Sequence, residues 1–143
     1  MDVVLMSDNC IFCKIIAGEI PAQKVHENEL FLAILDRFPA NMGHVIIIPK
    51  RHAENIFELN ENEATALMPL ALQVAKKIKT ELKPDGLNML QNNGTVAGQT
   101  VFHYHLHLIP RFNNDGFSFK HPHNDVEISE LDKMHKRLAY ETV

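Results

Sequence analysis

Three histidines alternate with apolar residues in the last third of the chain, in the segment His103-Tyr104-His105-Leu106-His107. Period-two alternation predicts a β-strand over 102–110, with the three imidazoles on one face at a spacing of about 6.8 Å and the apolar residues on the other. Imidazole is well suited to nucleophilic, acid–base or metal chemistry near neutral pH. A solvated strand face is the plain alternative, which we disfavour because any polar residue would serve there.

The middle histidine, His105, is the natural nucleophile of such a row. An imidazole attacks phosphorus through a neutral nitrogen, so its other nitrogen must carry a proton and donate it to an acceptor such as a backbone carbonyl. A flanking histidine can bind phosphate oxygens or protonate the leaving group. As a rival hypothesis, His103, His105 and His107 would bind one catalytic metal, although this spacing places only neighbouring pairs comfortably on one ion.

A polar loop leads directly into the histidine segment. It runs from Asn92 to Thr100 and contains Gly94, Gly98 and Gln99. Glycines allow backbone N–H groups to approach a ligand and to form anion-binding concavities. Donors beside a nucleophile stabilise the charge that develops in acyl or phosphoryl transfer. A simple hairpin connection is the alternative, but the adjacent histidines favour a functional loop.

Two cysteines, Cys10 and Cys13, form a C-x-x-C pair. The pair is interpreted as a metal knuckle, a redox dithiol or two buried thiols. A redox pair normally opens a long helix, whereas Gly18 limits the helix expected over 11–17 to about two turns, so metal binding is favoured. Two thiolates do not complete a tetrahedral zinc site, and histidines elsewhere in the chain are the obvious further ligands.

Short strands and one long helix must position these residues. Besides the histidine strand, hydrophobic runs predict strands over 24–27, 30–35, 44–49 and 87–92. Asn60 and Glu63 form a capping box at the start of the long helix, and Pro69 is expected to kink this helix or displace its start. Ser129 is expected to cap a last helix over 130–140. These elements predict an α+β fold: an antiparallel sheet of about five strands, one long helix and short terminal helices.

Bulk properties restrict the function classes. With 143 residues, 45% of them hydrophobic, the chain fits a single domain over 1–143, with a core over about 8–112 and a C-terminal tail and helix over 113–143. No apolar run approaches the roughly 18 residues of a membrane span, and residues 1–7 do not resemble a signal peptide. A net charge of −4 disfavours a nucleic-acid surface. A cytoplasmic protein is expected, with no membrane or nucleic-acid partner.

The chain resembles the histidine-triad family of nucleotide hydrolases and transferases, in its zinc-binding bacterial-type branch. The segment 103–109 matches the His-φ-His-φ-His-φ-φ motif, and the resemblance covers roughly residues 8 to 112. Further blocks in family order are 10–16, Leu35-Asp36, 43–52, 92–94 and 98–102. The resemblance implies a HIT-like homodimer whose sheets join, with a purine nucleotide or nucleotide conjugate bound across the histidine strand.

The resemblance also implies an activity. It implies hydrolysis at the α-phosphate of a nucleoside phosphoramidate or a dinucleoside polyphosphate, through a covalent nucleotidyl-histidine intermediate. A catalytically weak nucleotide-binding dimeric scaffold is the alternative. His105 resembles the nucleophile, its second nitrogen donating to the His103 carbonyl, and His107 resembles the phosphate-binding histidine. Asp36 resembles the carboxylate that accepts from the ribose hydroxyls, although a strand-ending turn residue is its plain alternative.

Other matched positions complete the expected site. Phosphate-loop ligands, a base-flanking residue and a supporting histidine are implied at Asn92, Gly98, Gln99, Thr100, Ile15 and His44. A structural zinc ion is implied at Cys10, Cys13, His52 and His103. Such a closed Cys₂His₂ site would tie the N-terminus to the histidine segment and orient His103. Beyond residue 113, where His121 and His123 lie, the resemblance assigns nothing.

Overall fold

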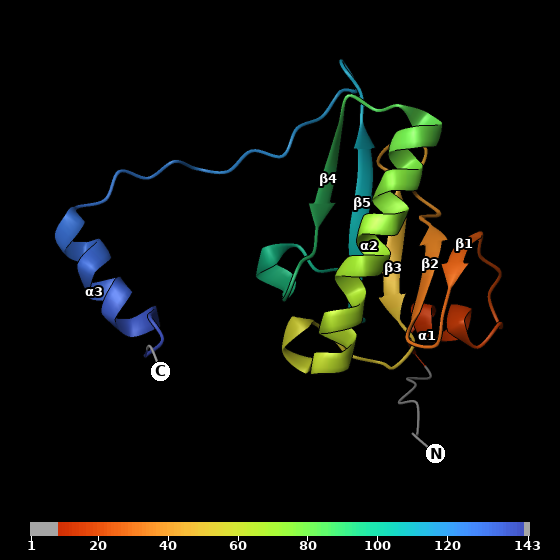
Figure 1. The fold of residues 1–143 in the computed structure, drawn as a ribbon, viewed down its shortest axis with the longest axis horizontal. Helices are drawn as coiled ribbons and strands as arrows, with labels where there is room; N and C mark the ends of the chain where they lie inside the picture. Colours follow the sequence, from red (N-terminus) through yellow and green to blue (C-terminus); the bar gives the residue numbers. More distant parts are fainter. Residues whose placement is uncertain (1–8, 142–143) are drawn as a thin grey trace.

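The computed structural model describes residues 9–141, and within them the chain folds around a five-stranded antiparallel sheet with the order β1-β2-β3-β5-β4 (Figure 1). The strands are β1 (Lys24–Glu27), β2 (Phe31–Leu35), β3 (Val45–Pro49), β4 (Gly86–Leu90) and β5 (Leu106–Arg111). The helices are α1 (Ile11–Ile16), α2 (Glu61–Leu82) and α3 (Ile128–Leu138), with single 3₁₀ turns at Ile56–Glu58 and Thr95–Ala97. The predicted α+β class and antiparallel sheet are confirmed.

Both faces of the sheet's centre are covered by helices. Side chains alternate along β2 and β3, so each strand contributes residues to both cores. On one face, α2 covers a core to which these strands contribute Phe31, Ala33, Val45 and Ile47. On the other face, α1 covers a second core to which they contribute Leu32, Ile34, Ile46 and Ile48. The continuous apolar runs in the sequence therefore reflect strands with two covered faces.

Helix α2 begins where the capping box predicts. The Asn60 side chain accepts from the Glu63 N–H, and the Glu63 carboxylate accepts from the Asn60 N–H. Glu63 is buried and also receives two hydrogen bonds from the Arg51 guanidinium, at 2.6 and 3.2 Å. Pro69 lies inside the helix without displacing its start. This Arg51–Glu63–Asn60 clamp joins the N-terminal end of α2 to the turn that follows β3.

The histidine strand is shorter than predicted. β5 begins at Leu106, and residues 101–105 lie before it in irregular structure. The Tyr104 N–H donates to the Ala53 carbonyl at 2.7 Å, so this backbone pairs with the turn after β3. Pro49, which ends β3, has no N–H to donate to a ladder, and its carbonyl is hydrogen-bonded to the His103 ring. Phe102 is exposed, so it does not pack in the core.

The last helix stands apart from the sheet (Figure 1). It begins at Ile128, two residues earlier than expected, and its N-cap is Glu127, which makes no side-chain capping bond. The prediction that Ser129 caps this helix is therefore wrong. Every residue of α3 is exposed. Within the described part of the chain, none of the helices combines the length and apolar character needed to cross a bilayer.

Candidate active site and metal cluster

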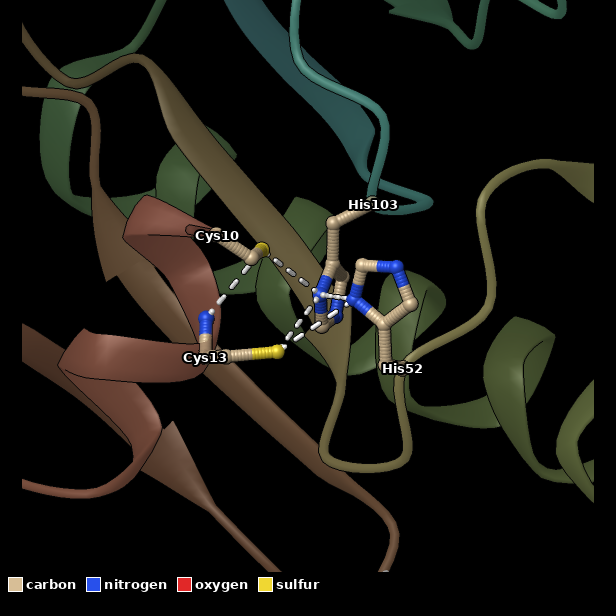
Figure 2. Close-up of side chains that lie close together, drawn as sticks. All are labelled: Cys10, Cys13, His52 and His103. Carbon is tan, nitrogen blue, oxygen red and sulfur yellow. Dashed lines mark hydrogen bonds between the residues drawn. The ribbon is translucent and has the colours of Figure 1, made fainter. Parts of the chain in front are cut away.

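Four potential metal ligands converge between α1 and the segment before β5 (Figure 2). Cys10 is the N-cap of α1 and Cys13 lies within that helix. His103 Nδ1 lies 3.3 Å from Cys10 Sγ and 3.6 Å from Cys13 Sγ. His52 Nδ1 lies 3.3 Å from Cys13 Sγ and 3.2 Å from His103 Nδ1. The expected ligand set is thus assembled from three separate parts of the chain.

The donor set fits a tetrahedral metal ion. Zn–N distances of about 2.0 Å and Zn–S distances of about 2.3 Å place the ligand atoms roughly 3.3–3.8 Å apart, close to the separations observed here. His103 Nε2 lies 2.8 Å from the Pro49 carbonyl and must donate to it, so Nδ1 carries the lone pair. Burial lowers the pKa of His103 to about 4, which keeps the ring neutral. These four residues could therefore hold a metal ion.

His105 has one nitrogen occupied and the other available. Its Nδ1 lies 2.7 Å from the His103 carbonyl, which can only accept. A neutral His105 therefore carries its proton on Nδ1 and a lone pair on Nε2. The Phe12 ring packs edge-on at 5.1 Å between centroids, which restricts the orientation of the imidazole. Burial lowers the pKa of His105, while the bond to the His103 carbonyl and the charge of Asp36 oppose this shift.

A second histidine pair lies beside His105. His44 Nδ1 accepts from the Ala40 N–H at 3.0 Å, so the proton of a neutral His44 is on Nε2. That nitrogen lies 2.8 Å from His107 Nδ1 and 3.5 Å from Asp36 Oδ2. His107 consequently accepts at Nδ1 and carries its own proton on Nε2. The rings of His105 and His107 are 4.8 Å apart.

These groups share a sheet face because of strand parity. His107 pairs with Ile46, so it points to the face that α1 covers. His44 and Asp36 have the same parity in their strands as Ile46 and Ile34. Gly43, at φ +98°, makes the turn into His44. A Cβ added to Gly43 would overlap Leu82 Cδ1. Burial, His105 and His44 together lower the pKa of His107 to about 4.

The three triad histidines do not converge on one point. His103 Nδ1 faces the cysteines, while His105 Nδ1 and His107 Nδ1 bond to different partners. This arrangement disfavours the rival hypothesis of one catalytic metal held by all three. Asp36, His44 and His107 also offer three ligand atoms close together. Their closest pair, at 2.8 Å, has the separation of a hydrogen bond rather than of two ligands of one ion.

The loop before β5 is organised by Gln99. The Gln99 side chain is buried, accepts from the Gly94 N–H at 2.7 Å and donates to the carbonyls of Glu54 and Val101. Its amide thus joins the loop to main-chain carbonyls on either side, one of them at Glu54 after β3. Gly98, at φ +98°, lies where a Cβ would come within 3.3 Å of Asn92 Nδ2. Thr100 is exposed.

Some residues of the site could not be found by pattern alone. Ile15 is buried in the core beneath α1, although the resemblance implies a place beside the base. Phe12 contacts both His103 and His105, and its position between the two cysteines was its only signal. The Ala40 N–H determines the tautomer of His44, and the Pro49 carbonyl determines that of His103. Every residue has such main-chain groups, so the sequence does not reveal which of them take part.

Comparison with known proteins identifies the family. The model of the HIT domain matches residues 17–114, which is more than half of the chain. The chain belongs to the HIT-domain family. Protein hit from Bacillus subtilis is 44% identical over 93% of this chain and 94% of its own length. HNT1 from Saccharomyces cerevisiae, named adenosine 5'-monophosphoramidase, is 42% identical over 90% of this chain and 80% of its own.

Solved HIT structures share the fold. SMU.412c from Streptococcus mutans is 39% identical and superposes with a TM-score of 0.88, covering 92% of this chain and 84% of its own. A Zn-bound histidine triad family protein from Mycobacterium smegmatis is 33% identical, with a TM-score of 0.72, over 88% of this chain and 97% of its own. The HIT-like fold predicted from the sequence is therefore confirmed.

Proposed function

We propose that this HIT protein is a nucleotide hydrolase acting at the α-phosphate of a nucleoside phosphoramidate or a dinucleoside polyphosphate. The hydrogen bond from His105 Nδ1 to the His103 carbonyl carries the proposal, because it leaves the Nε2 lone pair as a nucleophile. The yeast relatives named adenosine 5'-monophosphoramidase support a phosphoramidate substrate.

The proposed reaction has two steps: transfer of the nucleotidyl group to His105 and hydrolysis of that intermediate. His105 Nε2 attacks the α-phosphorus, an N–P bond forms, and the bond to the leaving amine or phosphate breaks. The departing amine or phosphate accepts a hydrogen bond from His107 Nε2–H, and an amine takes the proton that it needs from solvent, so His107 stays neutral. The nucleotidyl-His105 ring is then cationic, and its Nδ1–H remains bonded to the His103 carbonyl. A water oxygen then bonds to the phosphorus as the bond to His105 Nε2 breaks, which returns His105 to its neutral form. The nucleoside monophosphate leaves, and one proton passes to solvent.

The remaining residues would bind the nucleotide. Asp36 is assigned to the ribose hydroxyls, since a carboxylate accepts well from a cis-diol. Asn92, Gly98 and Thr100 are assigned to the phosphates. Ile15 flanks a purine base, and His44 holds the tautomer of His107. Gln99 shapes the phosphate loop through its buried amide rather than contacting the ligand directly.

We assign zinc to the Cys₂His₂ cluster. All four positions are filled by protein atoms, which is typical of a structural rather than a catalytic ion. The Zn-bound relative supports this choice. When bound, the ion would neutralise the two thiolates and fix the His103 ring, and through the His103 main chain this orients His105.

The same proposal covers the domain organisation, oligomeric state and location of the protein. Residues 1–143 form one histidine-triad domain, with the core and tail boundaries expected from the sequence. Two copies join their sheets as a homodimer, for which the free strand edges are β1 and β4. The protein acts in the cytoplasm on small nucleotides, without a nucleic-acid or membrane partner.

A covalent adduct tests the nucleophile. The protein is mixed with an adenosine phosphoramidate and quenched in alkali, where a phosphoimidazole survives, and its intact mass is measured. The expected result is a gain of one adenylyl group in the wild type and none in His105→Ala. His121→Ala, which removes an exposed histidine, is the matched control and should form the adduct normally.

The outcomes separate the hypotheses. An adduct formed at the wild-type rate in His105→Ala would overturn the assignment of the nucleophile. Binding of the nucleoside monophosphate without any adduct or turnover would instead favour the scaffold alternative. Comparing kcat/KM across phosphoramidates and dinucleoside polyphosphates identifies the leaving group.

A further inference from the structure

The His105 ring needs a restraint beyond its hydrogen bond. Among the described residues this ring makes one hydrogen bond, from Nδ1 to the His103 carbonyl at 2.7 Å. Rotation about the Cβ–Cγ bond of histidine has broad minima, so this bond fixes Nδ1 more closely than Nε2 on the far side of the ring. Moving a reacting atom by about 1 Å can slow a reaction about 100-fold. The direction of Nε2 therefore depends on what packs against the ring.

Two rings pack against His105. His107 lies 4.8 Å away and Phe12 lies 5.1 Å away, measured between ring centroids, and both contacts have interplanar angles of 70°. His107 is itself held by a hydrogen bond with His44. Phe12 is only 8% exposed and belongs to the core between α1 and the sheet. Phe12 is thus a buried apolar contact on one side of the proposed nucleophile.

Phe12 also contacts the metal cluster. Its ring lies 5.8 Å from that of His103, at an interplanar angle of 86°. In the chain it lies between Cys10 and Cys13. Cys10 Sγ is 3.3 Å from His103 Nδ1 (Figure 2). Cys13 Sγ is 3.3 Å from His52 Nδ1. The phenyl ring is therefore flanked by two candidate metal ligands on its own helix and contacts a third.

Helix α1 is too short to hold Phe12 in place by itself. It contains six residues, and isolated helices shorter than about 12–15 residues are marginal in water. Its N-cap is a cysteine, because Cys10 Sγ accepts from the Cys13 N–H at 3.4 Å. A metal ion bound to both sulfurs would fix the first turn of α1 at two points, one on each side of Phe12.

We propose that Phe12 is a positioning residue that couples the metal cluster to the nucleophile. With an ion bound at Cys10 and Cys13, the first turn of α1 is fixed, and Phe12 on that turn holds the His105 ring with Nε2 directed at the substrate. This connection runs through a side chain, in addition to the one that runs through the His103 carbonyl. The inference rests on the proposed role of His105 as the nucleophile.

A role in core packing alone predicts a different result. Phe31 is a second buried phenylalanine, but it lies in the core beneath α2, on the opposite face of the sheet. Leucine at either position removes an aromatic ring and keeps an apolar side chain. Phe31→Leu is therefore matched to Phe12→Leu in lost core packing, without any change beside His105.

Single-turnover adduct formation measures the positioning. With a saturating adenosine phosphoramidate, Phe12→Leu is expected to transfer the adenylyl group to His105 about 10- to 100-fold more slowly than the wild type. Phe12→Tyr, which keeps the ring, should restore most of the rate. Phe31→Leu should keep the rate within about twofold, and all three variants should keep the Kd for the nucleoside monophosphate within about twofold.

Three results would overturn the inference. The first is adduct formation at the wild-type rate in Phe12→Leu, and the second is an equal loss in Phe31→Leu. The third is a loss confined to the Kd for the nucleoside monophosphate, which would make Phe12 a contact of the bound nucleotide. Absence of any adduct in the wild type would instead refute the proposed reaction, and the coupling would then be decided without a substrate.

NMR of the free protein is that substrate-free measurement. The Phe12 ring current shifts the carbon-bound protons of the His105 ring, which are assigned through His105→Ala. Removal of zinc by a chelator should change these shifts in the wild type. The change should be much smaller in Phe12→Leu, because the ring that transmits it is absent, although metal analysis should still find about one zinc per chain. Unchanged shifts in the wild type, which need no variant to observe, or equal changes in both proteins would overturn the coupling.

Discussion

At the scale of residues, main-chain groups decide where the protons of the site lie. The His103 carbonyl holds the proton of His105, and the Pro49 carbonyl holds that of His103. The Ala40 N–H fixes His44, which in turn fixes His107. Each neutral ring therefore has a defined pattern of lone pair and proton: His103 Nδ1 has a lone pair toward the cysteines, His105 Nε2 has a lone pair, and His107 Nε2 has a proton to donate.

The low pKa of His107 predicts a measurable titration. In the folded protein burial and two neighbouring histidines lower the pKa of His107 to about 4, from an ordinary value of 6.5. The unfolded chain therefore binds more protons between these values, so this residue makes unfolding easier as the pH falls from 6.5 to 4. Above pH 6.5 the ring is neutral in both states, so it no longer makes the free energy of unfolding depend on pH.

NMR titration of labelled histidine is the measurement. The His107 resonances, assigned through His107→Gln, are expected to remain those of a neutral ring at pH 6 and to move only near pH 4. In denaturation experiments, His107→Gln should lose less stability than the wild type between pH 7 and pH 5. A midpoint at or above 6.5 would contradict the buried, neutral His107 described here.

Residue-level prediction succeeded where the cause was local. The residues predicted that a neighbouring backbone carbonyl would accept the proton on the second nitrogen of His105, and the resemblance implied that of His103; the two residues lie close together in any extended chain. The pairing of His44 with His107 requires two strands to be in register, and the Ala40 contact requires a particular loop conformation. Nothing in the residue types specifies either one.

At the scale of elements, the clamp at the N-terminus of α2 supports the turn that carries His52. Asn60 caps the helix, Glu63 completes the box, and Arg51 joins the buried Glu63 carboxylate to that turn. Removing one partner of a buried pair is far more costly than removing an exposed one. The capping residue can be changed without breaking the ion pair.

The cap can be tested by unfolding. Asn60→Ala removes the acceptor for the Glu63 N–H and should lower the free energy of unfolding by about 0.5–2 kcal/mol. Urea denaturation at pH 7 measures the change. Asn62→Ala, an exposed asparagine within the first turn, is the control and should cost less than about 0.5 kcal/mol. Equal losses in both variants would show that the cap contributes nothing.

Element boundaries show where sequence patterns stop being informative. Strands β1, β2 and β3 and helix α2 were predicted to within one residue because their hydrophobic runs, turns and cap are local signals. The histidine alternation also predicted strand at residues 102–105, but Pro49 ends the neighbouring strand and Tyr104 bonds to Ala53 instead. A ladder needs a partner, and the partner is chosen by tertiary structure.

At the scale of the whole molecule, the metal cluster connects α1, the turn after β3 and the segment before β5. Its residues are separated by up to 93 positions in the sequence, so an ion bound there would close long loops. The two cysteines and His103 are buried, and His52 is half-buried. We therefore expect an ion bound there to affect global stability more directly than the proposed reaction.

Zinc removal tests that division. Loss of a ligand present at about 1,000 times its Kd costs about 4 kcal/mol, which corresponds to a fall in Tm of roughly 8–16 °C for a chain of this size. A chelator should produce this fall in the wild type, with one zinc per chain released. Cys10→Ser, already lacking the site, should show no further change. Immediate loss of adduct formation in a still-folded apoprotein would favour a catalytic metal.

The whole-molecule arrangement was only partly accessible from sequence. The ligand set of the cluster came from the resemblance, and the structure brings those four residues together. The C-terminal tail lay outside every matched block, and its extended course depends on the contacts of Arg111. A helix pattern identifies an apolar face, but it does not identify the surface on which that face packs.

The ring and the carbonyl of His103 have different consequences for how this protein can be altered. Its ring belongs to the metal cluster, whereas its carbonyl positions His105. A side chain can be exchanged by mutation, but every amino acid supplies the same carbonyl. His103→Cys would therefore replace the imidazole of the cluster by a thiolate and keep the carbonyl that accepts from His105 Nδ1. Selection can change the type of ligand at this position without removing the carbonyl that fixes the orientation of His105.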